Sequence, residues 1–515
     1  MVPGRAHAIE ITTAQPAAQY NDPPRSEPPD TELTRALLPV VAEVAGSVKV
    51  AAPVADGRLC AVAEAIAAFS DDTPPPYAAV EFALAQHGII EPAPHLVVVR
   101  AGSGALADVA NELRGRLTEI LTAGAHARVG VGSADHGDGS MSVVVALQES
   151  FLTTDAVPRG AKVGTKISVR GALKAPYERP ELFVTGPGGQ VGRLALVLEG
   201  ERGFRASLAC EPRGRHQVEV VGHDGGGAAV LANFPVWCGE APPTTFRLEA
   251  MPEETAVADG ATAGRKIFEL ANADRARAGL STLTWDERAA EVARGHSKEM
   301  LATGVVSHVS PTTGTAADRV KRAGIATPLV LENLARAYSP EEAHQGLMNS
   351  PGHRANLLSA DATHLGIGVS LGRLVAGRPE LYVTQVFLRV PPPIDPKKAR
   401  QEVRDAIAAK RKTTGVRALV VDGELERIAQ ELADALASGV AQELATTRAD
   451  KAVDGLAGRM ASVVTLLVTG DPAAAAIDAT ADGSVDLLGV GVGQSPRDEQ
   501  ARGLIHVVVL LGKKR

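Results

Sequence analysis

Ser307-His308-Val309-Ser310-Pro311, Glu332-Asn333 and Asn349-Ser350-Pro351-Gly352-His353-Arg354 are three polar motifs that follow one another in a single segment of the chain. Each motif places an imidazole or a carboxylate beside a residue that favours a turn. We therefore expect three loops to bring His308, Glu332 and His353 into one cleft. The spacing alone is weak support, because polar groups at such separations also occur on ordinary protein surfaces.

Further motifs around this segment occur in the order found in one known family. They are Asn272–Leu280, Leu283–Asp286, Ala293–Met300, Ser307–Pro311, Glu332-Asn333, Asn349–Asn356, Gly366–Val369 and Tyr382–Phe387. With these motifs, the segment from about 262 to 390 resembles a bacterial CAP domain, also called SCP-like. CAP is the superfamily of pathogenesis-related 1, antigen 5 and cysteine-rich secretory proteins. The resemblance implies an α–β–α sandwich around a short antiparallel sheet.

The resemblance also implies a cleft with two histidines and two acidic residues, which binds a divalent metal in some members. His308 matches one histidine position and Glu332 one acidic position, and His353 belongs to the bacterial version of the motif. Tyr382 stands near the position of the eukaryotic second histidine, and with Gln385 it is a weaker cleft candidate. Two interpretations stay open: an open zinc or calcium site completed by water, and a metal-free polar cluster.

Neighbouring polar residues have structural interpretations. His296 has Val292 and Met300 one helical turn away on either side, which favours a satisfied residue at the edge of the core over a ligand. Glu341 and Glu342 follow Ser339-Pro340, a pattern typical of a helix start. Ser307, Ser310 and Ser350 are turn or cap residues, and no nucleophile elbow accompanies them.

Length and composition set the outer limits. A chain of 515 residues is too long for one core, so we expect three or four domains. Its net charge of −7 gives no general basic surface for nucleic acid. No apolar run is long enough to cross a bilayer. The first residues lack the charged and apolar regions of a signal peptide, whereas the family resemblance implies an extracellular or periplasmic protein.

The expected division of the chain follows changes in residue pattern. Short alternating apolar runs between Gly and Pro predict an immunoglobulin-like β-sandwich that contains Cys210, Cys238 and Trp237. Whether the two cysteines pair is left open. The fold class is α+β, with these segments: 1–30 a disordered lead-in, 31–152 an α/β module, 156–248 the sandwich, 262–390 the CAP domain, and 397–515 a second α/β module.

The two flanking modules repeat landmarks of the central one. Asp56, Asp286 and Asp422 are expected at equivalent helix starts, where a carboxylate can cap free backbone N–H groups. A glycine pair recurs as Gly130/Gly132, Gly366/Gly368 and Gly489/Gly491, which permits a close backbone path. We interpret the flanks as degenerate CAP-like modules, and whether they pack on one another is open. The alternative is that Ala- and Val-rich α/β segments resemble each other by chance.

The flanking modules lack the polar site. No histidine lies between His364 and His506, and the positions of the first module that face His308, Glu332 and His353 are approximately Asp72, Leu96 and Leu117. Loss of the site where the fold markers persist favours binding over catalysis.

Two functions are therefore carried forward. The first is an exported protein that binds a lipid, glycan or envelope protein. The second is a divalent-metal-dependent hydrolase, of which a peptidase is one form, that uses His308, Glu332 and His353. Whether the chain is an enzyme stays open.

Overall fold

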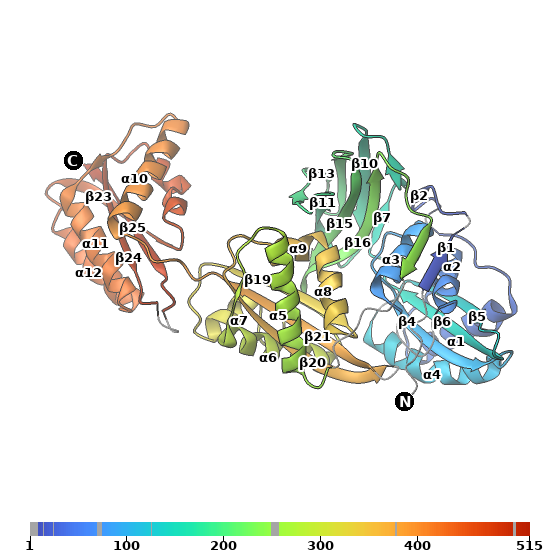
Figure 1. Cartoon of the computed structure of the whole chain (residues 1–515). Coiled ribbons are helices and arrows are strands. Elements are labelled where there is room, and N and C mark those ends of the chain that lie inside the picture. The colour runs from blue at the N-terminus through green and yellow to red at the C-terminus, as the bar shows by residue number, and fades with distance from the viewer. Residues whose placement is uncertain are drawn as a thin grey trace.

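The computed structural model describes residues 9–13, 15–23, 25–69, 75–124, 126–248, 257–375, 378–497 and 501–515. Figure 1 shows three α/β units and one all-β unit, with the carboxy-terminal unit set apart at one end of the molecule. The mixture of helices and strands agrees with the predicted fold class. We call the α/β units first, central and third in chain order, and the all-β unit the sandwich.

The central unit is a four-stranded sheet between two helical layers. Its face with Val383 and Phe387 packs on α5 and α8, and the opposite face with Val386 packs on α6 and α7. Its elements are α5 (Gly260–Arg277), β18 (Thr284–Trp285), α6 (Glu287–Thr303), α7 (Ala316–Arg322), β19 (Val330–Ala337), α8 (Pro340–Asn349), α9 (Pro351–Leu357), β20 (His364–Val375) and β21 (Arg378–Leu388).

The first unit has the same sheet order and strand directions as the central unit. A two-residue strand pairs in parallel with the next long strand, and two antiparallel pairings complete the order β3-β5-β6-β4 beside β18-β20-β21-β19. The elements of the first unit are α1 (Glu32–Ser47), β3 (Val54–Ala55), α2 (Gly57–Ala67), α3 (Tyr77–Gln86), β4 (His95–Gly102), α4 (Leu106–Ala123), β5 (Arg128–Asp135) and β6 (Ser140–Gln148).

The third unit repeats this arrangement once more, with the order β22-β24-β25-β23 and the same directions. Its elements are α10 (Pro396–Thr413), β22 (Val420–Val421), α11 (Gly423–Ala437), α12 (Gln442–Asp454), β23 (Met460–Thr469), the 3-10 helices η1 (Pro472–Ala475) and η2 (Asp478–Ala481), β24 (Leu487–Gln494) and β25 (Ile505–Lys514).

The glycine pairs explain how one helix of each unit lies against its sheet. A Cβ on Gly368 would lie 2.1 Å from the backbone nitrogen of Arg294 in α6. A Cβ on Gly132 would lie 2.1 Å from the nitrogen of Glu64 in α2, and one on Gly491 would lie 2.1 Å from the Ala429 carbonyl oxygen in α11. Only glycine permits this close approach. The predicted close backbone path is confirmed in all three units.

The predicted aspartate caps are also confirmed. Asp56, Asp286 and Asp422 are the N-cap residues of α2, α6 and α11, and each side chain accepts a hydrogen bond from a backbone N–H of the first turn. These bonds satisfy donors that the helix itself leaves unpaired. Asp286 also forms an ion pair with Arg502, which joins the central unit to the third unit.

The sandwich consists of two sheets, ordered β13-β14-β10-β7 and β12-β11-β15-β16-β9, that enclose one apolar core. Cys210 and Cys238, which follow β14 and end β16, form a disulfide between the two sheets. Their strands are β7 (Leu152–Thr154), β9 (Gly160–Ala161), β10 (Lys166–Leu173), β11 (Glu178–Thr185), β12 (Val191–Arg193), β13 (Leu196–Glu199), β14 (Gly203–Ala209), β15 (Gly214–Asp224) and β16 (Gly227–Cys238). Two further strands of this region, β8 (Val157–Pro158) and β17 (Thr245–Leu248), belong to neither sheet.

The predicted disordered lead-in is wrong for part of its length. Strand β1 (Ile9–Thr12) pairs with β17, and β2 (Gln19–Tyr20) pairs with β8. Tyr20 is fully buried against Phe234 and donates a hydrogen bond to the Pro235 carbonyl oxygen. One buried aromatic therefore fixes a segment whose composition suggests disorder. Residues 1–8, and 251–256 of the predicted linker, lie outside the described residues.

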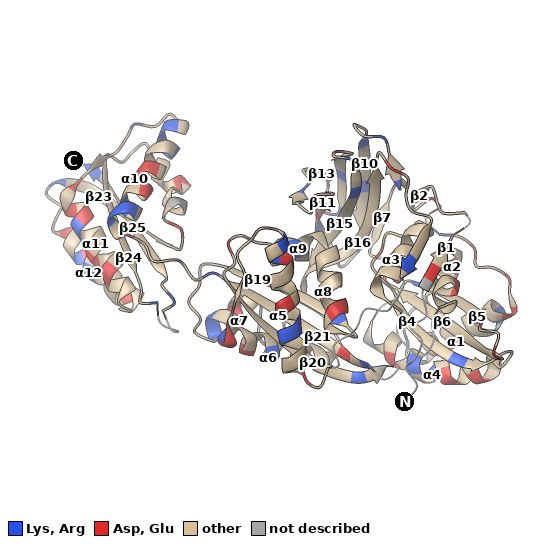
Figure 2. Cartoon of the chain, in the orientation of Figure 1, with Lys and Arg blue, Asp and Glu red and all other residues tan. Residues whose placement is uncertain are grey.

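Two surface properties bear on partners. In the part of the chain that the structure describes, no helix is both long enough and apolar enough to cross a membrane. Figure 2 shows acidic and basic residues interspersed on helices such as α10 and α11.

Candidate functional site

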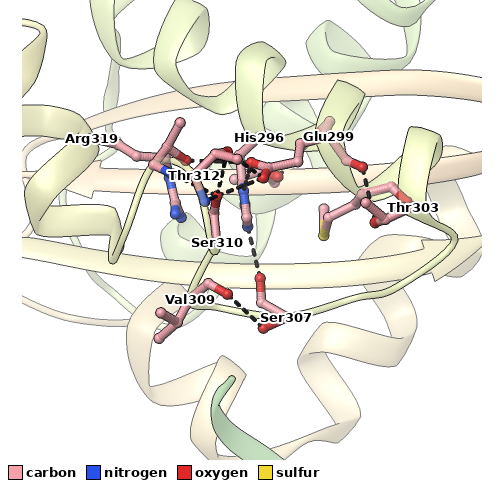
Figure 3. A network of polar contacts seen from close by, with 12 residues as sticks. His296, Glu299, Thr303, Ser307, Val309, Ser310, Thr312 and Arg319 are labelled. Carbon is pink, nitrogen blue, oxygen red and sulfur yellow. Dashed lines mark hydrogen bonds and ion pairs between the residues drawn. The ribbon is translucent and has the colours of Figure 1, made fainter. Parts of the chain in front are cut away.

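The loop that carries His308 is fastened to α6 by polar contacts (Figure 3). His296, buried on α6, places Nε2 2.8 Å from the Ser307 carbonyl oxygen. One turn later, Glu299 accepts hydrogen bonds from the hydroxyl groups of Ser310 (2.6 Å) and Thr312 (2.7 Å). Burial lowers the pKa of His296, and the positive charge of Arg319 lowers it further. His296 therefore positions the loop as a neutral side chain.

His308 and Glu332 meet, as the sequence predicts, and Arg319 joins them. Nδ1 of His308 lies 2.8 Å from Oε1 of Glu332, and the guanidinium of Arg319 forms an ion pair with Oε2. The side chains of Glu332 and Arg319 are 4% and 5% exposed, whereas that of His308 is 25% exposed. The buried carboxylate is thus neutralised by a buried cation, and both of its oxygens are used.

His353 lies near this cluster on α9, but it has other partners. Its Nδ1 lies 2.8 Å from Oγ of Ser350, and Ser350 donates a hydrogen bond to the carboxyl group of Glu219 on β15. Glu219 also accepts a hydrogen bond of 2.8 Å from the backbone N–H of Gly352. The loop that carries His353 is therefore held by the sandwich.

The pKa values near His353 reflect burial. Burial, together with the smaller effect of the neighbouring His308, lowers the pKa of His353 to about 4. Glu219 is fully buried, and this raises its pKa to about 7 although two hydrogen bonds oppose the shift. The interface between the sandwich and the central unit therefore contains a neutral imidazole and a carboxyl group that ionises near neutral pH.

The Glu-Asn pair serves both faces of the sheet because successive strand residues point in opposite directions. Glu332 points toward α7, and the fully buried Asn333 points toward α9. The amide of Asn333 donates to the His353 carbonyl oxygen at 3.1 Å and to Oε1 of Gln385 at 3.0 Å. Gln385 is thus a buried support for Asn333, not a residue that contacts the histidines.

Tyr382 does not join the cluster. It packs in a separate apolar group with Met300 and Leu334, and its ring lies 5.7 Å from the guanidinium carbon of Arg336. Glu341 and Glu342 occupy the first turn of α8, whose N-cap is Ser339, as predicted.

The sandwich covers the His308 loop. The Gly226 carbonyl oxygen, at the turn between β15 and β16, accepts hydrogen bonds of 2.9 Å from both the hydroxyl of Ser307 and the backbone N–H of Val309. A Cβ placed on Gly227 would lie 2.9 Å from Cβ of His308. Cavities of 930 and 310 Å³ are present among the described residues, and neither is lined by His308, Glu332 or His353.

The donor set does not fit the divalent metal that the family resemblance implies. Both oxygens of Glu332 already have partners, and the charge of Arg319 would repel a second cation at the same carboxylate. Within the described residues, no group of three or more His, Cys, Asp or Glu side chains is placed to hold a metal ion.

Sequence reasoning missed three residues: Arg319, Glu299 and Glu219. Arg319 and Glu299 had a local signal, since Arg319 lies within α7, the first helix after the His308 loop, and Glu299 lies three residues after His296. Glu219 had none, because it comes from another unit.

Comparisons with known proteins agree with the central unit's geometry. The family model for CAP, the cysteine-rich secretory protein family, matches residues 268–387. The uncharacterized membrane protein YlbC of Bacillus subtilis is 38% identical over 129 residues, which is 25% of this chain and 35% of that protein. The uncharacterized protein YkwD of the same organism is 40% identical over 105 residues, 20% of this chain and 41% of that protein. The chain therefore spans less than half of the length of these relatives.

Solved structures give weaker likenesses. An extracellular protein with an SCP domain from Bacillus anthracis is 23% identical with a TM-score of 0.23, and covers 45% of this chain and 84% of that one. A cysteine-rich secretory protein from Staphylococcus aureus is 14% identical with a TM-score of 0.20, and covers 47% and 83%. The family-model match and the order of the motifs identify residues 268–387 of this chain as a bacterial CAP domain.

Proposed function

We propose that this is an exported protein that binds an envelope component, with its CAP domain acting as a structural centre and not as a hydrolase. The single observation that carries the proposal is that the residues of the polar cluster are already bonded to one another and to the sandwich. Both carboxylate oxygens of Glu332 are bonded, one to His308 and one to Arg319. The loops that carry His308 and His353 are both hydrogen-bonded to the sandwich. A site with these contacts holds units together and leaves little room for a substrate.

We further propose that the first and third units are degenerate CAP-like modules. Support comes from the shared strand order, the shared aspartate caps and the shared glycine pairs. We assign the sandwich to the immunoglobulin-like type, supported by the disulfide between its sheets and by Trp237 next to Cys238.

Export is supported by the chemistry of the sandwich. A buried disulfide between Cys210 and Cys238 is typical of an oxidising compartment, because cytosolic thiols are kept reduced. Cys60, in contrast, is a buried free thiol whose pKa is raised by burial.

The second function is the divalent-metal-dependent hydrolase with His308, Glu332 and His353 around the metal. Partial exposure of the His308 ring favours it. It requires Arg319 to leave Glu332 and the sandwich to leave the His308 loop.

Sedimentation with isolated bacterial envelopes tests the first function. We expect the intact chain to sediment with envelopes, a His308→Ala variant to sediment equally, and neither protein to cleave a peptide substrate in added zinc. If the chain stays in the supernatant, the envelope-binding proposal is wrong. Zinc-dependent cleavage that His308→Ala abolishes would establish the hydrolase instead.

A further inference from the structure

The larger cavity lies where three units meet, away from the polar cluster. Its volume is 930 Å³, and its wall combines residues 95–100 of β4 with Tyr177 of the sandwich and with Arg336 and Tyr338 of the CAP domain. This volume is within the usual range for ligand sites, which often lie between domains. Figure 1 shows β4 on the side of the first unit that faces the CAP domain.

Strand β4 is an edge strand, and half of its backbone groups point away from its sheet. It pairs only with β6, with Gly102 opposite Ser140, and the next N–H, that of Ser103, donates to the Gly139 carbonyl oxygen. Because hydrogen-bonded and outward residues alternate in antiparallel pairs, the outward residues are Leu96, Val98 and Arg100.

An independent contact confirms this direction. The guanidinium of Arg116 reaches the Val98 carbonyl oxygen at 2.9 Å from α4, which requires that oxygen to face outward. Among the described residues, no backbone group is bonded to the outward N–H groups of Leu96, Val98 or Arg100. These donors belong to a strand that lines the cavity, and an extended segment with backbone acceptors is the natural partner for such an edge.

The equivalent edge of the CAP domain is closed by a side chain of the same unit. Sheet register places Leu96 at the position of Glu332, since their partners Ala146 and Val386 lie opposite Gly130 and Gly366. The Glu332 carbonyl oxygen is bonded to the side-chain amide of Asn356 at 3.2 Å, so α9 closes that edge. In the first unit, the cavity occupies the corresponding place.

The walls beside β4 differ in polarity. Glu112 and Arg116 of α4 line one side, and Tyr77 and Val80 of α3 line the other. At the end of the cavity beside His95, Arg336 forms an ion pair with Glu380 and Arg373 forms one with Glu119. A lipid chain offers no acceptors for the N–H groups, whereas an extended peptide offers acceptors and two side-chain faces.

We propose that this cavity binds an extended peptide as an added strand on β4, with alternating apolar and polar side chains. The site is distinct from the His308 cluster, so it stands or falls independently of the proposed function.

Fluorescence anisotropy on the intact chain tests the proposal. The probe is a labelled peptide of about seven residues that alternates valine and threonine. We expect saturable binding that weakens about tenfold or more when alternate amides of the peptide are N-methylated, because several backbone hydrogen bonds are lost. This comparison needs no change in the protein.

A matched pair of variants locates the site. Val98→Pro removes an outward N–H from β4, and Leu467→Pro removes the equivalent one from the edge strand β23 of the third unit. We expect only Val98→Pro to weaken binding by about tenfold. The proposal is overturned if the peptide does not bind, or if N-methylation of the peptide does not weaken its binding. It is also overturned if both variants bind the peptide as tightly as the wild type does, or if palmitate displaces the unmethylated peptide.

Discussion

The central and first units share a scaffold but differ at one register position. Glu332 of the central unit binds His308 and Arg319, whereas Leu96 of the first unit packs among apolar residues. The strand register places Leu96 at the position in the first unit that is equivalent to Glu332 in the central unit, as predicted. Asp72, predicted at the position equivalent to His308, lies outside the described residues. The comparison teaches that the aspartate cap and the glycine pair build the fold, while the polar cluster is an addition to it.

The largest expected effect comes from making the central unit like the first. Glu332→Leu would leave the guanidinium of Arg319 buried and unpaired, which costs about 3–5 kcal/mol. Hydrogen exchange of β19 and β21, followed by mass spectrometry, measures the loss of stability.

The double variant Glu332→Leu/Arg319→Leu is the matched control. Removal of both charges should recover most of the loss, since an apolar pair tolerates burial. Equal destabilisation by the single and double variants would show that the ion pair does not carry the effect.

The next prediction concerns Glu219, whose contact with the CAP domain should make stability depend on pH. The pKa of Glu219 is about 7 in the folded state, against 4.5 as its ordinary value. The protonated carboxyl group therefore stabilises the folded state fully below about pH 4.5, and this contribution to the free energy of unfolding is lost as the pH rises through about 7. Relative to Glu219→Gln, the wild type should lose about 3 kcal/mol between about pH 5 and about pH 8.

Urea unfolding at several pH values, with hydrogen exchange to localise the change, measures this difference. His353 titrates in the opposite direction at lower pH, and it cancels because both proteins contain it. If the difference in the free energy of unfolding between wild type and Glu219→Gln does not vary with pH, the pKa of Glu219 is not raised.

A third prediction tests the shared scaffold. Gly368→Ala should destabilise the central unit by about 1–3 kcal/mol, because its Cβ would meet the backbone of α6. Gly132→Ala should do the same in the first unit. Thermal unfolding and unit-specific hydrogen exchange measure both.

Gly295→Ala, in α6 itself, is the control for added bulk. A Cβ there meets nothing within 4 Å, so alanine should stabilise by about 0.5–1 kcal/mol through helix propensity. If all three variants behave alike, close helix–strand contact is not the reason for the glycine pairs.

The smallest effect concerns Tyr382. Tyr382→Phe should cost no more than about 1 kcal/mol, since the ring keeps its packing with Met300 and loses only its hydroxyl. Envelope binding should not change. A loss of binding with unchanged stability would return Tyr382 to the site.

The sequence predicts features that depend on local chemistry. Asp286 before a helical pattern and the Gly366/Gly368 pair before a strand have physical roles that can be inferred without coordinates. The meeting of His308 with Glu332 follows from the family resemblance. The contacts of Glu219 and Gly226 could not be predicted, because they join units far apart in the chain. The prediction that residues 1–30 are disordered fails for the same reason, because Tyr20 is buried in the core of the sandwich, which is far away in the chain.

Calorimetric titration of the intact chain with zinc, beside the same titration of His308→Ala, tests the central claim most directly. We expect no stoichiometric zinc binding that depends on His308, because Arg319 is paired with the carboxylate that a metal would need. One equivalent of zinc bound by the wild type and lost in His308→Ala would contradict it.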